Sequence, residues 1–291
     1  MKKVRTAVFP VGGLGTRFLP ATKSMPKEML PIANKPIIQY AFEEAKNAGI
    51  ERFIFVTGRN KAAINNHFDH AYELESKLDE NNKAKELEQV ISWMPEAGQM
   101  AFVRQQKPLG LGHAVWCARH FIGDEPFAVI LADEMMMQSK GRKRNFLGEM
   151  IDFYESKNEK ASVIAVGEID IKDSTKYGII KNEGSEKITD MVEKPKPEVA
   201  PSIFSITGRY ILQPEIFKYL EKFQVGSGGE IQLTDAMKEM CKDYPYYYKI
   251  IDELRFDCGN VLGYLEANIA FALQDEKVSE DVKKMLKKYS Q

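Results

Sequence analysis

The residues best suited to chemistry lie together on one segment near the N-terminus. A glycine-rich turn, Gly12–Arg17, directly follows the first apolar run of the chain. Its glycines allow the backbone to approach a phosphate or a base, and they expose N–H groups as hydrogen-bond donors. Arg17, Lys23 and Lys27 add three cations to the same segment. Backbone donors, an arginine and two lysines suit the crowded negative charge of a triphosphate, so this segment predicts a phosphate site.

Two well-known phosphate-binding motifs do not describe this segment. A P-loop ends its glycine-rich turn with Gly-Lys-Ser or Gly-Lys-Thr, and neither follows here. A dinucleotide-binding fingerprint has a third glycine where this chain has Phe18, which disfavours an NAD-dependent dehydrogenase. Pro20 and Pro26 also keep the chain irregular where either motif would begin a helix.

The elements that would position this segment alternate in type along the first half of the chain. Short apolar runs rich in β-branched residues predict buried strands at Val4–Val11, Arg52–Thr57, Met100–Arg104, Phe127–Leu131 and Ser162–Val166. Amphipathic stretches predict helices at Pro36–Asn47, Lys61–Phe68, Gly112–Phe121 and Asn145–Glu155, and a longer, more exposed helix at Ala71–Trp93. This alternation predicts an α/β fold with a Rossmann-like, mostly parallel sheet that helices cover on both faces.

The second half of the chain follows a different pattern. Two runs around turn-forming residues predict a β-hairpin, and the proline-rich stretch Lys194–Pro201 predicts an extended connection. The two strands of the hairpin are expected at Tyr177–Asn182 and Lys187–Glu193, and further strands at Ile203–Leu212 and Tyr246–Ile251. Helices are expected from Pro214 and over Glu230–Cys241. The proline-rich stretch is too short for an interdomain linker, so we expect a single domain over 1–291 with a mixed sheet.

Composition and charge exclude several classes of partner. With 44% hydrophobic and 29% charged residues, the chain has an ordinary globular composition. Its net charge of −1 offers no general attraction for nucleic acid or for an anionic membrane, and we expect neither as a partner. The longest apolar run, Pro126–Ala132, is about a third of a membrane-spanning helix. Cys117, Cys241 and Cys258 are far apart, which argues against a disulfide scaffold and favours a cytoplasmic protein with reduced thiols.

The order of several short motifs resembles that of a known family. Gly-x-Gly-Thr-Arg-x-x-Pro at Gly13–Pro20 and Pro-Lys-Glu-Met-Leu-Pro at Pro26–Pro31 are similar to the signature of the sugar-nucleotide pyrophosphorylases, and within them to the bacterial UTP–glucose-1-phosphate uridylyltransferases. Further matching segments follow in order at Lys35–Tyr40, Arg104–Gln105, Gly110–Ala114, Leu131–Asp133, Lys176–Gly178, Val192–Pro195, Gly208–Tyr210, Glu230–Asp235 and Asp257–Gly259. The resemblance spans Val4–Ala272 and implies a fold of the nucleotide-diphospho-sugar transferase type.

This resemblance implies which residues would contact the nucleoside. The backbone at Gly12 and Gly13, together with Glu28, would approach it. Gln105 and Gly110 would read the uracil edge, because a side-chain amide provides both a donor and an acceptor. The pairing favours a pyrimidine, although uracil and thymine differ only by one methyl group.

The same resemblance implies the contacts to the phosphates and to a metal ion. Arg17 would hold the β- and γ-phosphates, and Lys27 would hold the α-phosphate. Asp133 would bind Mg²⁺, because a hard cation prefers oxygen ligands and ligands lie beyond the carboxyl ends of such strands. Asp257 would be a second metal ligand.

The second half of the chain would then bind the sugar phosphate. Gly178 and Glu193 would contact the sugar, and Lys194 would contact its phosphate. The nucleotide would be bound mainly by residues 1–135 and the sugar phosphate mainly by residues 160–260. Helices in residues 260–291 would be available for contacts in a homo-oligomer, a dimer or a tetramer.

The implied reaction makes UDP-glucose and pyrophosphate from UTP and α-D-glucose 1-phosphate. A phosphate oxygen of the sugar phosphate would attack the α-phosphorus of UTP in line, and this nucleophile needs no general base because it is already ionised at neutral pH. Arg17, Lys27 and Lys194, with Mg²⁺, would position the two polyanions and neutralise their repulsion. Two alternatives stay open: a related transferase that uses dTTP, another nucleotide or a different sugar phosphate, and a non-catalytic nucleotide-sugar sensor.

A few positions depart from the family pattern or need a plainer interpretation. Gly12 stands where alanine is usual, a change that we expect to be harmless or to ease the approach of the nucleotide. Glu134 and Met135–Met137 are an unusual continuation after Asp133, and we expect the methionines in a loop or in the core. His113 is expected to have a structural or supporting role.

Overall fold

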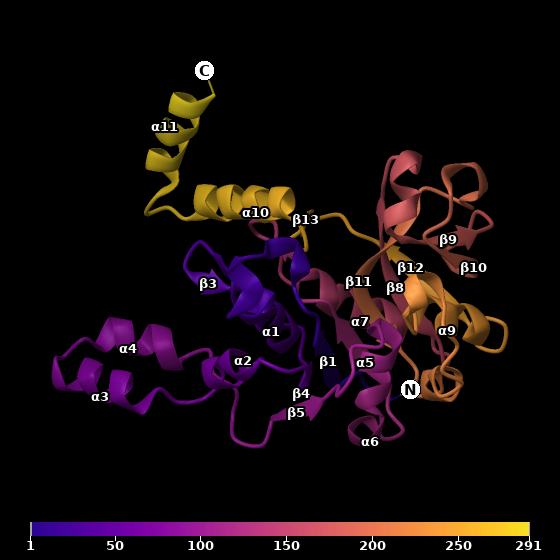
Figure 1. The fold of residues 1–291 in the computed structure, drawn as a ribbon, viewed down its shortest axis with the longest axis horizontal. Coiled ribbons are helices and arrows are strands. Elements are labelled where there is room, and N and C mark those ends of the chain that lie inside the picture. The colour runs from indigo at the N-terminus through magenta and orange to yellow at the C-terminus, as the bar shows by residue number, and fades with distance from the viewer. Residues whose placement is uncertain (1, 291) are drawn as a thin grey trace.

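The computed structural model describes residues 2–290, in which nine strands form one sheet (Figure 1). Their spatial order is β5 (Met100–Arg104), β4 (Arg52–Thr57), β1 (Thr6–Val11), β6 (Phe127–Ile130), β11 (Phe204–Leu212), β8 (Ser162–Glu168), β12 (Tyr246–Ile250), β10 (Lys187–Glu193) and β9 (Gly178–Asn182). Seven of these nine strands run in one direction, and β11 and β10 run in the other. The predicted α/β fold with a mixed, mostly parallel sheet is confirmed.

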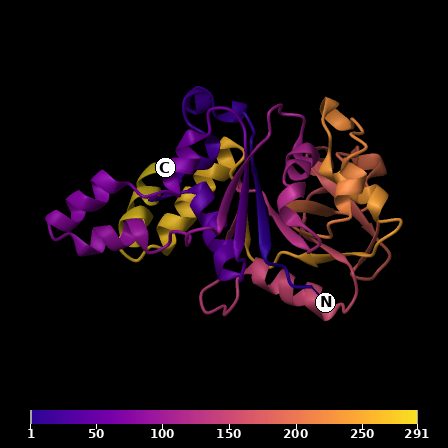
Figure 2. The ribbon, with the colours of Figure 1, turned by 90° about the horizontal axis from the view of Figure 1, so that it is seen from below.

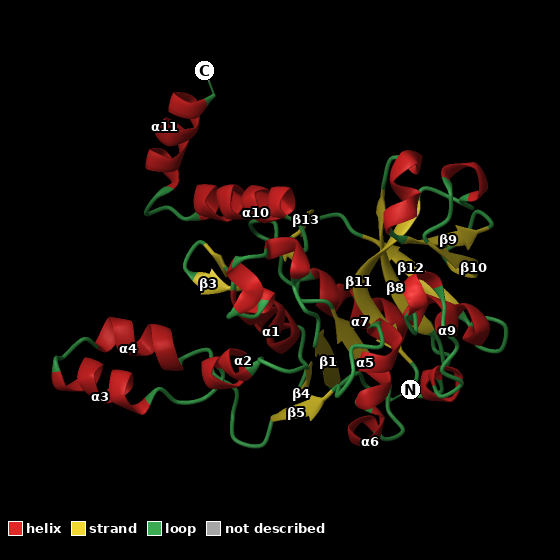
Figure 3. Ribbon diagram, in the orientation of Figure 1, coloured by secondary structure: helices red, strands yellow, loops and turns green. Residues whose placement is uncertain are grey.

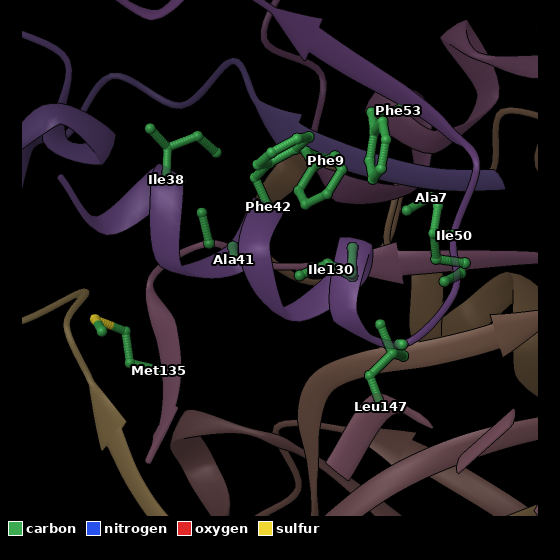
Figure 4. Packing of buried hydrophobic residues seen from close by; sticks show 14 of the residues in the cluster. Ala7, Phe9, Ile38, Ala41, Phe42, Ile50, Phe53, Ile130, Met135 and Leu147 are labelled. Carbon is green, nitrogen blue, oxygen red and sulfur yellow. The ribbon is translucent and has the colours of Figure 1, made fainter. Parts of the chain in front are cut away.

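Buried side chains point alternately to the two faces of the central strands, and helices pack against them on both faces of this sheet. On one face, Phe9 of β1 and Phe53 of β4 lie beside Phe42 of helix α1 (Ile37–Asn47), as Figure 4 shows. The rings of Phe42 and Phe53 are 4.6 Å apart between centroids. Helix α7 (Phe146–Ser156) contributes to the same core. The position of α1 is therefore set by large apolar side chains that are removed from water.

The opposite face is covered by a second set of helices. Val8 of β1 and Ile54 of β4, each next in sequence to a residue of the first core, belong to this second core. The helices on this side are α5 (Leu111–Cys117), α6 (Arg119–Ile122), α8 (Ile216–Leu220) and α9 (Leu233–Met240). Figure 2 shows helices on either side of the central strands. The alternation of side chains along each strand thus produces the three-layer arrangement that the sequence predicts.

The prediction of one long helix over Ala71–Trp93 is wrong. Two antiparallel helices, α3 (Tyr72–Glu80) and α4 (Ala84–Ile91), occupy this segment and lie away from the sheet beyond α2 (Ala62–His67) (Figure 3). Between them, Asn82 has a φ of 54°, in the left-handed region that asparagine tolerates better than most residues. A single backbone reversal at Asn82 therefore divides the predicted helix into a hairpin.

Two other predicted segments are also interrupted. The helix expected over Gly112–Phe121 is divided at Ala118 into α5 and α6. The stretch Lys194–Pro201, predicted to be an extended connection, contains a 3₁₀ turn at Pro197–Val199. Pro197 begins that turn, where the fixed φ of proline is favourable.

Four short strands escaped the sequence analysis. β7 (Glu134–Met137) pairs with β13 (Leu254–Asp257), and β2 (Pro31–Ile32) pairs with β3 (Lys35–Pro36). Met135 and Met137 of β7 are buried, so the core interpretation of the methionines is right and the loop interpretation is wrong.

Two helices complete the chain at its C-terminal end. α10 (Val261–Gln274) lies near β13, and α11 (Ser279–Tyr289) extends beyond it at the top of Figure 1. Nowhere in residues 2–290 is there a helix with the length and apolar character needed to cross a membrane.

Candidate functional site

The candidate site lies beyond the carboxyl ends of the parallel strands. Gly12 follows β1 directly, Gln105 follows β5 directly, and Asp133 lies three residues after the end of β6. Gly58, just after β4, is so close to Gly12 that a β-carbon on Gly58 would lie 2.7 Å from the Gly12 carbonyl oxygen. Because neighbouring parallel strands end at the same edge of a sheet, residues far apart in sequence meet there.

The glycine-rich segment is irregular, as predicted. After β1 it contains only short 3₁₀ turns, at Thr16–Phe18, Ala21–Lys23 and Lys27–Met29. Gly15 has a φ of 68°, and its carbonyl accepts a hydrogen bond from Thr22 Oγ1 at 2.6 Å. A side chain at Gly15 would need the left-handed conformation that glycine adopts without strain.

The cation Lys27 lies directly on the carboxylate of Asp133. Lys27 Nζ donates a hydrogen bond to Asp133 Oδ2, and both side chains are about a quarter exposed, at 23% and 25%. Burial lowers the pKa of Lys27, but the nearby carboxylates of Asp133 and Glu28 outweigh it and raise the pKa overall. Burial raises the pKa of Asp133, but Lys27 and Arg17 outweigh it and lower the pKa overall. Both partners therefore carry their charges at neutral pH.

Asp257 and Arg17 meet Asp133 around Gly259. A β-carbon on Gly259 would lie 2.9 Å from Asp257 Oδ1, 3.1 Å from Asp133 Oδ2 and 3.4 Å from Arg17 Nη1. Arg17 Nη1 also donates to the Gly259 carbonyl at 3.4 Å. The structure thus places two carboxylates and two cations, Arg17 and Lys27, around one small space that only glycine leaves open.

This space suits a divalent cation that is shared with a ligand. Asp257 Oδ1 accepts a hydrogen bond from Gly259 N at 2.8 Å, and Asp257 Oδ2 accepts one from Asn260 Nδ2 at 3.0 Å, so the carboxylate is held in place. Across residues 2–290 there is no group of three or more His, Cys, Asp or Glu side chains that could hold a metal ion. Mg²⁺ typically takes one or two carboxylates and completes its shell with water and substrate phosphates, so Asp133 and Asp257 fit that ion.

A second group of predicted residues lies on the Gln105 side of the glycine turn. Gln105 is buried, and its Nε2 donates to the Gly110 carbonyl at 3.1 Å. A β-carbon on Gly12 would lie 2.7 Å from Gln105 Oε1. Glycine at position 12 therefore leaves room for the amide of Gln105. The alanine that is usual at this position would require the end of that side chain to shift.

His113 supports the same amide. Its Nδ1 lies 3.1 Å from Gln105 Nε2, and burial, with a smaller contribution from Arg119, lowers the pKa of His113. A neutral ring whose Nδ1 lacks a proton can accept the hydrogen bond from Gln105. The expected supporting role of His113 agrees with these contacts.

The loop that carries Gly110 is held by a segment that precedes α9. Ile231 N donates to the Leu109 carbonyl at 2.8 Å, and Gly112 N donates to the Ile231 carbonyl at 2.9 Å. The helix predicted from Glu230 begins only at Leu233, because these bonds keep the preceding residues extended. Gly110 itself has a φ of 106°, and a β-carbon there would lie 2.8 Å from the Ile231 carbonyl oxygen.

Glu28 has a partner that the sequence analysis missed. The Glu28 carboxylate is 2% exposed, and Lys61 Nζ lies 2.7 Å from its Oε2 atom. Lys61 itself is 6% exposed. Burial raises the pKa of Glu28, and the opposing effects of Lys61 and Lys27 only reduce this rise. No sequence signal marked Lys61, since a lysine at the start of a predicted helix is ordinarily a surface residue.

Arg59, next to this buried pair, is a second cation that the sequence analysis did not select. Together with Lys23, Gly13 and Lys61 it lines a cavity of about 220 Å³ beside the glycine-rich segment. Lys23, one of the three predicted cations, therefore faces this cavity, whereas Arg17 and Lys27 lie at Asp133.

The residues expected to bind a sugar phosphate also lie together. Gly178 and Glu193 are paired across the β9–β10 hairpin, and a β-carbon on Gly178 would lie 3.0 Å from Glu193 Oε2. Lys194 Nζ lies 3.6 Å from Glu193 Oε1. Lys194 also has a φ of 49°, a conformation that costs a non-glycine residue about 1 kcal/mol or more and that concentrates at functional sites.

A partly buried ion pair connects this hairpin with the carboxylate site. Arg255 of β13 donates to Glu134 of β7, with Nε 2.7 Å from Glu134 Oε2. The Arg255 guanidinium also lies 5.4 Å from the centre of the Tyr177 ring, and Tyr177 accepts a backbone hydrogen bond from Lys194 N at 2.9 Å. Glu134 and Arg255 were not predicted as a pair, because their contact depends on the pairing of β7 with β13.

Comparisons with known proteins find relatives that match nearly the whole chain. The family described as "Nucleotidyl transferase" matches residues 6–274. The UTP–glucose-1-phosphate uridylyltransferase of Bacillus subtilis (strain 168) is 47% identical over 286 residues, which cover 97% of this chain and 96% of that relative. The enzyme of the same name from Staphylococcus epidermidis (strain ATCC 12228) is 46% identical over 291 residues, which cover 99% of each chain.

Two solved structures have the same fold over nearly the whole chain. UTP-bound UGPase from Acinetobacter baumannii has a TM-score of 0.90 and 38% sequence identity, covering 99% of this chain and 100% of that one. A UDP-glucose pyrophosphorylase in complex with UDP-glucose has a TM-score of 0.81 and 41% identity, covering 92% of this chain and 98% of that one.

Proposed function

This chain belongs to the nucleotidyl transferase family, and from that membership we propose that it makes UDP-glucose and pyrophosphate from UTP and α-D-glucose 1-phosphate. The observation that carries the proposal is the meeting of Arg17, Lys27, Asp133 and Asp257 around Gly259. The names of the similar enzymes, and of the solved structures with UTP and with UDP-glucose, support the same reaction.

The proposed chemistry is an in-line displacement at phosphorus. A phosphate oxygen of glucose 1-phosphate forms a bond to the α-phosphorus of UTP, and the bond from that phosphorus to the bridging oxygen of the β-phosphate breaks. The leaving group is pyrophosphate, and the nucleophile is already ionised, so no side chain has to remove a proton. The protein therefore has to orient two polyanions and offset their repulsion.

The cations of the site have separate tasks in this proposal. Arg17 would hold the β- and γ-phosphates, where its planar fork can bind two oxygens at once. Lys27 would bind the α-phosphate and exchange its present partner, Asp133, for the more negative ligand. Lys194, on the hairpin beside Glu193, would bind the phosphate of the sugar.

Mg²⁺ is the proposed cofactor. Asp133 and Asp257 would hold the ion, since their oxygens face one space and a hard cation prefers carboxylates. When bound, it would neutralise triphosphate charge and polarise the α-phosphate.

The base and the sugar would be read on opposite sides of these charges. Gln105 Nε2 already donates to the Gly110 carbonyl and to His113, so its Oε1 would be the atom that accepts from a uracil edge. Gly110 and the backbone at Gly12 and Gly13 would lie beside the base. Glu28 would contribute by holding its loop against Lys61 near the nucleoside.

On the other side, Gly178 and Glu193 would contact the sugar hydroxyl groups. Residues 1–135 would thus bind mainly nucleotide and residues 160–260 mainly sugar phosphate, within one domain.

Self-association and location are further parts of the proposal. α10 exposes apolar side chains at Val261, Leu262, Leu265 and Ile269, which supports a homo-oligomer, a dimer or a tetramer. Light scattering after size-exclusion chromatography would measure its mass, and a single chain mass at micromolar concentration would contradict it. The free cysteines support a cytoplasmic location.

The direct test is release of pyrophosphate with Mg²⁺, across four nucleoside triphosphates, each with glucose 1-phosphate and other sugar phosphates. Release with UTP and glucose 1-phosphate alone is the expected result. Release with dTTP or with another sugar phosphate would assign the chain to a related transferase. Tight binding of UDP-glucose without any release would instead indicate a sensor.

A further inference from the structure

We infer that Arg209 is a positioning residue that fixes the turn on which Asp133 lies. The inference rests on the proposed role of Asp133 as a ligand of the metal ion. Arg209 was noted only as part of a matching segment, and the proposed reaction gives it no task.

The contacts of Arg209 surround the turn that contains Asp133. Arg209 lies on β11, beside β6, and is 1% exposed. Its Nη1 donates to the Leu131 carbonyl at 2.8 Å, and its Nη2 donates to the Glu134 carbonyl at 2.8 Å. Leu131 and Glu134 are the first and last residues of this turn, and Glu134 N donates to the Leu131 carbonyl across it at 3.3 Å. One planar guanidinium therefore holds both ends of the turn.

The other side of the guanidinium is anchored to a helix. Nε lies 3.2 Å and Nη2 lies 2.7 Å from Glu44 Oε2. Glu44 belongs to α1, whose apolar side packs against β1 and β4 in the first core. Because that core is closely packed, α1 gives Arg209 a rigid support. Through Arg209, this support reaches the backbone on both sides of Asp133.

The path of the turn decides where the Asp133 carboxylate lies. The Asp133 carbonyl accepts a hydrogen bond from Cys258 N at 2.7 Å, which places the turn beside the end of β13 and Asp257. Mg²⁺ demands near-ideal octahedral geometry with oxygens at about 2.0–2.1 Å, so a small displacement of one carboxylate weakens binding. A residue that holds the backbone of a ligand thus acts on metal affinity without contacting the ion.

Lysine cannot replace Arg209 in this task. A guanidinium donates from several nitrogens in a fixed plane, and here it serves two carbonyl groups and one carboxylate together. An ammonium group keeps the charge opposite Glu44 but cannot hold both carbonyls in the same arrangement. Arg209→Lys therefore removes the positioning while it retains the ion pair.

The test compares Arg209→Lys with a matched variant at the other end of the same strand region. Gln213, just after β11, is also buried, and its Nε2 donates to the Ala161 carbonyl at 2.6 Å, far from the turn in the strand register. Gln213→Leu is thus the control for losing a buried bond to a backbone carbonyl. Asp133→Asn tests the proposed metal ligand itself. Glu44→Gln weakens the anchor of Arg209 without changing Arg209.

The measurement is the affinity of each full-length protein for Mn²⁺ in the presence of UTP, read from the electron paramagnetic resonance signal of free Mn²⁺. UTP binding in EDTA, read from the shift in melting temperature, is measured alongside it. For Arg209→Lys we expect Mn²⁺ affinity to fall about tenfold or more, with UTP binding in EDTA changed less than about twofold. Glu44→Gln should also lower Mn²⁺ affinity, but by a smaller factor. Gln213→Leu should lower the melting temperature without changing Mn²⁺ affinity.

Two results would overturn the inference, and they differ in what else they remove. If Asp133→Asn weakens Mn²⁺ binding but both Arg209→Lys and Glu44→Gln bind Mn²⁺ like the parent, Arg209 is purely structural and the proposed function stands. If Asp133→Asn itself binds Mn²⁺ like the parent, the metal assignment fails, and the inference fails with it.

Discussion

Replacing Lys61 by methionine would leave the buried carboxylate of Glu28 without its partner. The two side chains are 2% and 6% exposed, so water cannot replace the lost ion pair. Methionine keeps most of the apolar stem of lysine, which limits the change in packing. The expected loss of stability therefore arises from the charge and not from a cavity.

The size of this loss follows from the pKa of Glu28. Breaking a buried pair on one side typically costs 3–5 kcal/mol, and the carboxyl can limit this cost to that of taking up a proton. Starting from the ordinary value of 4.5, neutralising it at pH 7 costs about 3.4 kcal/mol at about 1.36 kcal/mol per pKa unit. At pH 5 the same step costs only about 0.8 kcal/mol.

The stability of the Lys61→Met variant should depend on pH. Burial already raises the pKa of Glu28 in the parent, and removing Lys61 raises it further. The folded state then binds more protons than the unfolded state above pH 4.5, so its stability falls as the pH rises through this window. Because the pKa of Glu28 is already raised in the parent, these costs are upper limits. Lys61→Met should lower the free energy of unfolding by at most about 3 kcal/mol at pH 7 and by at most about 1 kcal/mol at pH 5.

Urea denaturation of parent and variant at the two pH values measures this difference. Lys77→Met is the matched control, because Lys77 pairs with Glu80 on the surface and should change stability by less than about 0.5 kcal/mol at either pH. Adding Glu28→Gln to Lys61→Met should recover most of the loss at pH 7. An equal loss at pH 5 and pH 7 would refute the reasoning, since it would show that Glu28 does not carry the penalty.

Other substitutions test the site itself. Gln105→Ala removes the buried amide that would read the base, so we expect weaker discrimination among nucleoside triphosphates in steady-state assays; an unchanged nucleotide profile would show that the base is read elsewhere. Gly110→Ala combines a φ of 106° with a backbone oxygen 2.8 Å away, and should lower stability by about 2 kcal/mol or more on thermal unfolding. Asp133→Asn should reduce kcat at least about a hundredfold at saturating Mg²⁺ while circular dichroism stays unchanged. Lys194→Met should raise the KM for glucose 1-phosphate more than that for UTP, and the opposite order would contradict its assignment to the sugar phosphate.

The organisation of the site around Gly259 has a simple electrostatic consequence. Asp133 and Asp257 keep Arg17 and Lys27 close together, although these two cations would otherwise repel each other. A polyanion that enters this space meets cations already collected in one place, although Lys27 has to exchange Asp133 for it. The two carboxylates thus keep the cations in place even without a bound metal ion.

Much of the fold was readable from the amino-acid sequence, because its signals are local. The runs Arg52–Thr57 and Met100–Arg104 were predicted with the bounds that the structure has, since apolar β-branched runs report burial directly. The irregular glycine-rich segment was predicted from glycines and prolines whose backbone preferences do not depend on the rest of the chain. The grouping of Arg17, Lys27 and Asp133 was inferred from a resemblance and not from spacing.

Features that depend on distant partners needed the tertiary structure. Arg209 and Glu44 are 165 residues apart in sequence, and Lys61 and Glu28 are 33 apart, so neither pairing has a local pattern. β7 and β13 were missed for the same reason, because each is short and becomes a strand only beside the other. The sequence by itself determined the nine strands of the main sheet and the residue types that are available for chemistry. The tertiary structure decided which of these residues meet, because contact between distant side chains depends on how the elements pack.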